Sequence, residues 1–275
     1  MALTITSTAT LRGGVEIPLL GLGVYQSRPG EETQRAVEAA LALGYRHLDT
    51  ARAYGNERDV AAGIAASGVP RDQVFVTTKL WNSDHGYDET LRACDASLAR
   101  LGVERVDLYL VHWPVQRLRS DTWRAMERLR KDGKARAVGV SNYTVRHLEE
   151  LLARANEPPA VNQVELHPFL QQRELVEFCR ARGIVIEAYA PLVKAQRMDH
   201  PVLRRLAAKH QATPAQILVR WALQLGYVAL PKSVRAERIR ENADVYRFEL
   251  DADDLAALER LDEGLRTSWD PSDAP

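Results

Sequence analysis

Four polar residues stand out for the chemistry that their side chains would perform together: Asp49, Tyr54, Lys79 and His112. An aspartate beside a lysine holds the lysine as a cation and offsets part of the cost of burying it. That cation would stabilise a tyrosinate at Tyr54 and bring its pKa from about 10 toward neutrality. Tyr54 would then act as a general acid toward an alkoxide forming on a carbonyl, while His112 directs a ring N–H at the same oxygen. The four residues therefore predict acid–base chemistry on a carbonyl group.

Each of these residues also has an ordinary structural explanation when it is considered alone. A strand-end aspartate often caps a helix, a tyrosine packs, a lysine is solvated and a histidine sits in a core. Their positions favour a shared site, because Asp49, Lys79 and His112 end three successive apolar runs and Tyr54 follows the first of these. Such a site requires a fold in which the ends of successive strands lie side by side.

Short apolar runs alternate along the chain with longer amphipathic stretches, which is the pattern of repeated βα units. The eight predicted strands are Leu19–Gly23, Tyr45–Asp49, Val74–Lys79, Val106–His112, Ala135–Ser141, Val161–Glu165, Ile184–Tyr189 and Tyr227–Pro231. The predicted helices are Thr33–Leu43, Glu89–Leu101, Thr122–Lys131, Val145–Ala153, Glu174–Arg182, Pro214–Leu225 and Leu255–Leu261. Near-continuous apolar strands indicate a parallel sheet that is covered on both faces.

A parallel sheet of this kind is either closed into a barrel or open and doubly wound. An open sheet usually carries a glycine fingerprint after its first strand, but here Gln26 stands where its last glycine or alanine would be. We therefore predict an α/β fold, a single (β/α)₈ TIM barrel domain over residues 1–275, with an N-terminal β-hairpin cap at Thr4–Ile17. The active site of such a barrel lies at the carboxyl ends of the strands, where the four polar residues fall.

Three longer stretches carry a resemblance to a known family. They are Gly44–Ala51 continuing to Glu57, Asp107–Pro114, and Leu230–Ser233 continuing to Asn242. On these motifs the chain resembles the aldo-keto reductase family over nearly its whole length, and the bacterial 2,5-diketo-D-gluconate reductase-like branch most closely. The resemblance implies that Asp49, Tyr54, Lys79 and His112 form a catalytic tetrad. It also implies hydride transfer from a nicotinamide cofactor that is bound without a Rossmann fold.

A basic turn follows the last predicted strand. Lys232, Ser233, Arg235 and Arg238 lie within seven residues at the start of a short helix, and phosphate sites are common there. A solvated basic turn is the alternative. Together with the resemblance, the turn predicts a clamp on the adenosine 2′-phosphate, which favours NADPH over NADH. The predicted cofactor contacts are Ser141, Asn142, Gln163, Tyr189, Pro191, Leu192, Lys232, Ser233, Val234, Arg235, Arg238 and Asn242.

The resemblance assigns the nicotinamide end to four of these contacts. Ser141, Asn142 and Gln163 would hold the carboxamide, and Tyr189 would stack on the ring. Two departures concern the loop that some relatives close over the pyrophosphate. Gln26 and Gln196 occupy the positions of a Lys–Asp latch, and the loop Pro191–Lys194 lacks the glycine common in relatives. We expect weaker latching and faster cofactor release.

Aromatic residues near three strand ends predict the walls of a substrate pocket: Tyr25, Trp81 and Trp113, together with His112. An uncharged aromatic pocket suits aldehydes, dicarbonyls and keto-sugars. Three arginines in nearby loops are weaker candidates for a contact to substrate; these are Arg52, Arg117 and Arg119. The short loop 115–120 and short tail 266–275 predict an open pocket with loose specificity.

Two other functions fit parts of the sequence. The chain could be an NADPH-binding regulatory or structural barrel without significant turnover, although such a protein has no need of the complete tetrad. It could also be a Schiff-base aldolase that uses Lys79, but Asp49 should keep that amine charged. The other six histidines, His47 among them, are interpreted as structural or surface residues. We find no ligand pattern for a metal, and Cys94 and Cys179 are expected to be reduced packing residues.

The overall composition points away from polyanionic partners and membranes. Lys plus Arg and Asp plus Glu are equal at 37 each, so the formal net charge is zero and no nucleic-acid-binding surface is expected. Neither a signal peptide nor an apolar run of about 18 residues is present. We expect a cytoplasmic protein, a monomer, whose partner is a small-molecule carbonyl substrate.

Overall fold

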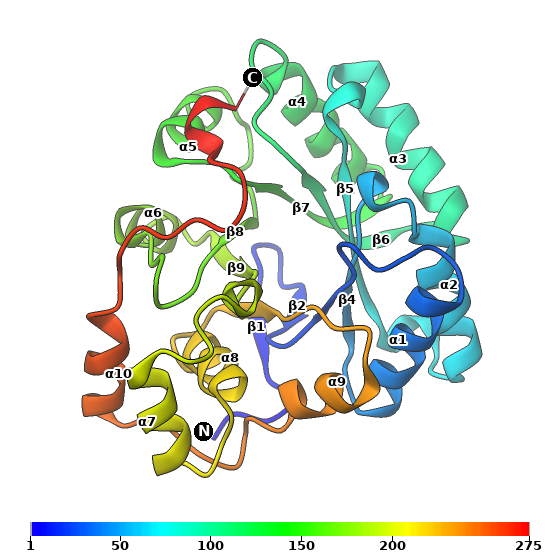
Figure 1. Ribbon diagram of the computed structural model, residues 1–275. Helices are drawn as coiled ribbons and strands as arrows, with labels where there is room; N and C mark the ends of the chain where they lie inside the picture. Colours follow the sequence, from blue (N-terminus) through cyan, green and yellow to red (C-terminus); the bar gives the residue numbers. More distant parts are fainter. Residues whose placement is uncertain (1, 275) are drawn as a thin grey trace.

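A computed structural model describes residues 2–274 and begins with a β-hairpin. Its strands β1 (Thr8–Thr10) and β2 (Glu16–Pro18) pair antiparallel. The Leu11 amide donates to the carbonyl oxygen of Val15 and closes the turn between them. In Figure 1 the hairpin lies across the centre of the view, inside the ring of helices. This is the cap that the sequence predicts.

Eight parallel strands form the main sheet in sequence order, so that successive strands are neighbours. They are β3 (Leu22–Gly23), β4 (His47–Asp49), β5 (Phe75–Leu80), β6 (Val106–Val111), β7 (Ala135–Ser141), β8 (Val161–Glu165), β9 (Val185–Tyr189) and β10 (Val228–Leu230). Bridges from Leu20 to Ala229 and from Gly23 to Lys232 join the first strand to the last. The sheet is therefore closed into a barrel.

Gly21 lies at this closure and shows why a glycine is needed there. A Cβ atom at Gly21 would lie 2.7 Å from Cδ2 of Leu230 and 2.8 Å from Nδ1 of His47. Any larger residue would push the two edge strands apart or displace the buried His47 ring. The close approach of β3 and β10 also brings the basic turn after β10 beside the loop after β3.

Helices surround the strands (Figure 1). They are α1 (Glu31–Ala42), α2 (Glu57–Ser67), α3 (Tyr87–Leu101), α4 (Arg119–Lys131), α5 (Val145–Leu152), α6 (Arg173–Arg180), α7 (Pro201–Lys209), α8 (Pro214–Gln224), α9 (Ala236–Ala243) and α10 (Ala252–Glu259). Local sequence sets several ends: Thr213 caps α8 ahead of Pro214, and Gly102 ends α3 in the left-handed conformation. Within residues 2–274, no helix is long and apolar enough to cross a membrane.

The predicted α/β barrel with its hairpin is confirmed, and most element bounds agree within a few residues. Helices α2 and α7 were not predicted. Each buries one short stripe, with Val60, Gly63 and Ile64 in α2, and Leu203, Leu206 and Ala207 in α7. A stripe of three small or isolated apolar residues gives too weak a periodic signal to identify a helix.

The two thiols pack inside the helical layer. Cys94 in α3 and Cys179 in α6 are fully buried and free, as expected for packing residues. Burial raises the pKa of Cys94 to about 12 and that of Cys179 to about 11. Neither side chain carries a thiolate at neutral pH, so neither is a candidate nucleophile.

Candidate active site

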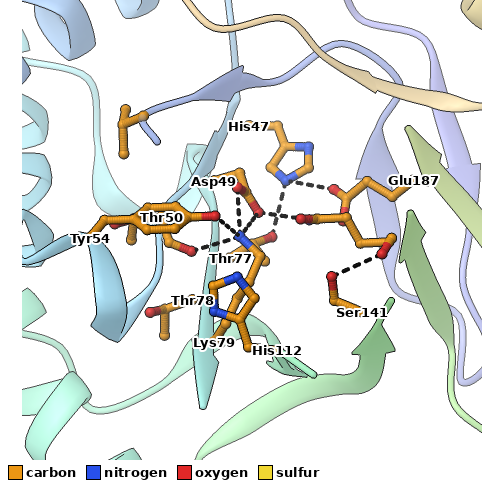
Figure 2. A network of polar contacts seen from close by, with 12 residues as sticks. His47, Asp49, Thr50, Tyr54, Thr77, Thr78, Lys79, His112, Ser141 and Glu187 are labelled. Carbon is orange, nitrogen blue, oxygen red and sulfur yellow. Dashed lines mark hydrogen bonds and ion pairs between the residues drawn. The ribbon is translucent and has the colours of Figure 1, made fainter. Parts of the chain in front are cut away.

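Lys79 is the centre of a polar network at one end of the barrel (Figure 2). Its Nζ donates to both carboxylate oxygens of Asp49 at 2.7 and 2.8 Å, and to the hydroxyl oxygen of Tyr54 at 3.3 Å. Lys79 and Asp49 come from neighbouring strands, and Tyr54 ends the 3₁₀ turn Arg52–Tyr54 after β4. Burial lowers the pKa of Lys79, but Asp49 and Tyr54 outweigh burial and raise it overall. Lys79 is therefore a cation, which disfavours the Schiff-base alternative.

The pKa of Tyr54 moves in the direction opposite to the one expected from the sequence. Burial raises this pKa to about 12, because the loss of hydration destabilises the tyrosinate more than the nearby Lys79 cation stabilises it. The expectation of a pKa near neutrality is thus wrong for this structure. The phenol keeps its proton at neutral pH, which is the state that a general acid requires.

His112 follows β6 and faces the same region (Figure 2). Its ring centroid lies 5.7 Å from that of Tyr54 and 5.3 Å from that of Trp81. Burial lowers the pKa of His112 well below its ordinary value, and the Lys79 cation lowers it further. The imidazole is therefore neutral and keeps one N–H, which it can donate to a carbonyl oxygen.

Gln163, Glu187 and His47 form a second layer of the network, deeper in the barrel than the tyrosine. Nε2 of Gln163 donates to Asp49 Oδ2 at 2.9 Å and to Glu187 Oε2 at 2.6 Å. Nε2 of His47 lies 3.5 Å from the other oxygen of Glu187. Burial raises the pKa of Glu187 to about 8 and lowers that of His47 to about 4. Glu187 was not predicted as a site residue, although a carboxyl group within the apolar run 184–189 is a signal of a buried polar site.

Gln163, in the middle of β8, joins this layer to the other predicted carboxamide contacts, which lie at the ends of β7 and β9. Ser141 Oγ donates to the carbonyl oxygen of Gln163 at 2.9 Å. Asn142 Nδ2 donates to the carbonyl oxygen of His112 at 3.0 Å, and Tyr189 Oη donates to Asn142 Oδ1 at 2.8 Å. These hydrogen bonds fix the four side chains relative to His112, and therefore relative to the tetrad.

The basic turn after β10 leads into α9. Lys232, Arg235 and Arg238 are exposed, and none of them forms an ion pair with another part of the described chain. Ser233 Oγ accepts a hydrogen bond from the Arg235 amide at 3.2 Å, which shapes the turn, and Asn242 lies buried farther along α9. Three exposed cations at and just before the N-terminus of α9, which outnumber the single acidic residue Glu237 of its first turn, form a suitable phosphate site. Val234 lies between them.

The weaker latching expected at Gln26, Gln196 and the loop after β9 stays a prediction. No hydrogen bond joins the side chains of Gln26 and Gln196 within residues 2–274; instead Lys232 Nζ donates to the carbonyl oxygen of Gln26 at 3.4 Å. Pro191 is buried and Leu192 half-buried. Val193, Lys194 and Ala195 all adopt positive φ, a conformation that favours glycine.

Aromatic side chains surround the tetrad. The Tyr25 ring lies 5.1 Å from that of Tyr54, and the Trp113 ring lies 5.8 Å from that of Trp269. Trp269 was not predicted, because it lies in the C-terminal tail and no local pattern marks it as a pocket residue. It is 72% exposed, so an apolar ligand could cover much of its surface. The buried Arg119 is a poor substrate contact, since it bonds to Pro114 and Glu150.

Glu165 at the end of β8 holds the tail across this region. Its carboxylate accepts hydrogen bonds from the amides of Thr267 at 2.7 Å and Ser268 at 3.0 Å. Lys194 in the loop after β9 donates to the carbonyl oxygen of Thr267. The tail that carries Trp269 is therefore tied to both the sheet and the predicted cofactor loop.

This arrangement can be compared with known proteins. The model for the aldo/keto reductase family matches residues 19–263. The chain belongs to the aldo/keto reductase family. Among its relatives, the glyoxal reductase of Bacillus subtilis is 47% identical over 99% of both chains. The 9,11-endoperoxide prostaglandin H2 reductase of Trypanosoma cruzi is also 47% identical, over 95% of this chain and 94% of the relative.

Solved aldo-keto reductases have the same fold. A mutant of Gox0644 in complex with NADPH matches with a TM-score of 0.93 and 41% identity, over 98% of this chain and 99% of the other. The predicted family is confirmed, whereas the diketogluconate-reductase-like branch stays a prediction. No cluster of three metal-ligating side chains occurs in the part of the chain that the structure describes.

Proposed function

We propose that this aldo-keto reductase uses NADPH to reduce aldehydes, dicarbonyls or keto-sugars to alcohols. The observation that carries the proposal is the contact of 3.3 Å between the Lys79 ammonium and the Tyr54 hydroxyl. Lys79 is also ion-paired to Asp49, and the neutral His112 ring lies beside Tyr54. This set places an acid and a second hydrogen-bond donor next to each other in a partly dry site.

The residues of this chain fit the proposed cofactor at both ends. The exposed cations Lys232, Arg235 and Arg238 suit the 2′-phosphate that distinguishes NADPH from NADH. At the other end, Gln163 and Asn142 present amide groups beside the tetrad. Bound NADPH would supply the hydride that reduces the carbonyl carbon.

The chain itself would bind the carbonyl oxygen and protonate it. The neutral His112 would donate an N–H to that oxygen and orient it. As negative charge develops there, Tyr54 would transfer its phenolic proton, and Lys79 would stabilise the tyrosinate that remains. The ion pair with Asp49 keeps Lys79 charged and in place. Because the pKa of Tyr54 is about 12, this acid is protonated before each turnover at neutral pH.

The substrate class follows from the walls of the site. Tyr25, Trp81, Trp113 and Trp269 offer apolar and aromatic surface. We find no buried, unpaired arginine among the described residues that would select a carboxylate. Relatives at nearly equal identity are named for glyoxal and for a prostaglandin, so family membership alone does not set substrate size.

NADPH oxidation with a panel of aldehydes, dicarbonyls and ketoses tests the proposal, with wild type beside Tyr54→Phe. We expect turnover in wild type and a loss of at least about 100-fold in the variant, with NADPH affinity retained. NADPH binding without turnover on any carbonyl would instead support the regulatory or structural barrel. Equal turnover in both proteins would contradict the role of Tyr54.

A further inference from the structure

Glu187 is a buried carboxyl group that the tetrad chemistry does not use. It lies in β9, fully shielded from solvent, and faces His47 and Asp49 from β4, Lys79 from β5 and Gln163 from β8. Packing alone does not explain it, because an apolar residue would fill the same place without the cost of burying a polar group. Its closest partner is the side-chain amide of Gln163, at 2.6 Å.

Two carboxyl groups accept hydrogen bonds from the same atom of the Gln163 side-chain amide, its nitrogen Nε2. Nε2 carries two hydrogens, and one is donated to Asp49 Oδ2 at 2.9 Å while the other is donated to Glu187 Oε2. The reverse orientation of the amide would place its oxygen against the oxygens of the Asp49 carboxylate, which is ion-paired to Lys79, and is therefore disfavoured.

The amide oxygen is left for a ligand. Oε1 of Gln163 accepts no hydrogen bond from residues 2–274, and it is not among the fully buried side-chain atoms that lack a partner. It therefore reaches solvent near the carboxyl end of β8. Asn142 cannot substitute for it readily, since its amide already bonds to His112, Ser141 and Tyr189.

We propose that Glu187 is a positioning residue for the nicotinamide end of the cofactor. Together with Asp49 it takes both amide hydrogens of Gln163, and so presents the Gln163 oxygen as an acceptor for the carboxamide N–H. This inference rests on the proposed function, because it requires that NADPH binds here. Glu187 touches no reacting atom; it acts through the orientation of Gln163.

The test uses three ligands that differ at the nicotinamide end. NADPH carries the carboxamide N–H, its 3-acetylpyridine analogue has a methyl group in place of the amide nitrogen, and 2′,5′-ADP lacks the ring altogether. Dissociation constants are measured by quenching of intrinsic fluorescence. For wild type we expect NADPH to bind about tenfold more tightly than the acetylpyridine analogue, because the analogue leaves Oε1 of Gln163 without a donor.

Two variants remove the carboxyl group at position 187 and one keeps an acceptor at the same reach. Leucine has no acceptor, and the threonine hydroxyl lies two bonds closer to the backbone than the carboxyl oxygens, so in Glu187→Leu and Glu187→Thr the preference for NADPH over the analogue should fall to below about threefold. Glu187→Gln still offers an amide oxygen and should retain most of the preference. Affinity for 2′,5′-ADP should be unchanged in all three. Asp107→Asn, which alters a buried carboxylate at the amino end of β6, serves as a matched control and should retain the wild-type preference.

The outcomes separate this inference from the proposed function. If wild type does not bind NADPH, the proposed function itself fails. If wild type binds NADPH and a folded Glu187→Leu or Glu187→Thr keeps the full preference, Glu187 does not position Gln163. Equal loss of affinity for 2′,5′-ADP, or failure of all three variants to fold, would assign Glu187 to folding and overturn the proposal.

Discussion

Replacing Lys79 by methionine tests its electrostatic role, the stabilisation of the Tyr54 oxyanion, separately from its role in folding stability. The Nζ atom lies 3.3 Å from the Tyr54 hydroxyl oxygen. At that separation two unit charges interact by about 5 kcal/mol for an effective dielectric constant of about 20. The Asp49 carboxylate opposes the effect of Lys79 on the Tyr54 tyrosinate. We therefore take the net stabilisation of the tyrosinate by Lys79 to be about 2–4 kcal/mol. The Lys79→Met variant should therefore lose about 30- to 1000-fold in kcat/KM for carbonyl reduction.

The same substitution also breaks a buried ion pair. Asp49 would lose both hydrogen bonds from Lys79 and keep the one from Gln163 at 2.9 Å. Leaving one charge of such a pair without its partner costs about 3–5 kcal/mol of folding stability. The melting temperature of Lys79→Met should accordingly fall, and this fall is measured by circular dichroism in parallel with steady-state kinetics.

A double variant tells the two effects apart. Combining Lys79→Met with Asp49→Asn removes both charges, so much of the lost stability should return. Activity should not return, because the cation that stabilises the Tyr54 oxyanion is still missing. Recovery of kcat/KM together with the melting temperature would refute this reasoning, as would a folded Lys79→Met protein that loses less than about tenfold.

Four further outcomes follow from the site. The reduction rate should show no loss from ionisation of Tyr54 between about pH 6 and about pH 10. A pKa raised to about 12 keeps this acid protonated until the pH approaches that value. An inflection near neutrality that moves when a more acidic fluorotyrosine is placed at position 54 would contradict this prediction. Arg238→Ala should raise the Kd for NADPH about tenfold and leave that for NADH nearly unchanged, since the lost contact is to the 2′-phosphate; equal losses in titration calorimetry would assign the arginine elsewhere. Trp269→Ala should raise KM for a bulky aromatic aldehyde about three- to tenfold but not for glyoxal, which is too small to reach the tail; parallel changes for both substrates would argue against a pocket wall. Stopped-flow fluorescence of NADPH binding should show no slow closing phase, because Gln26 and Gln196 carry no charge to latch; a slow phase with a long residence time would disprove it.

The barrel was predictable from sequence because its strands are buried on both faces and read as apolar runs. The order of these runs also placed Asp49, Lys79 and His112 at neighbouring strand ends, as the structure does. The short helices α2 and α7 were not predictable in the same way, since each buries a single stripe of three residues. Most of their stability comes from packing against other helices, α2 against α1 and α3, and α7 against α8 and α10.

The electrostatics of the site could not be read from residue types. The sequence suggested that Lys79 would lower the pKa of Tyr54, whereas burial by several different elements raises it. Ser268 in the tail donates its amide to Glu165, about a hundred residues earlier in the chain, and no pattern of spacing indicates such a contact. Glu187 was predictable in part. A carboxyl group in an apolar strand indicates an unusual buried site, but the sequence does not show which residues it contacts.

The deep burial of both thiols has a consequence for how the protein would tolerate the carbonyl compounds that we propose as its substrates. Aldehydes and dicarbonyls are electrophiles, and the side chains that they attack most readily in proteins are thiolates. Cys94 and Cys179 are shielded from solvent, and pKa values of about 12 and about 11 leave almost no thiolate at neutral pH. Covalent attack at cysteine is therefore disfavoured, and the exposed lysines and arginines are the groups left open to slow chemical damage.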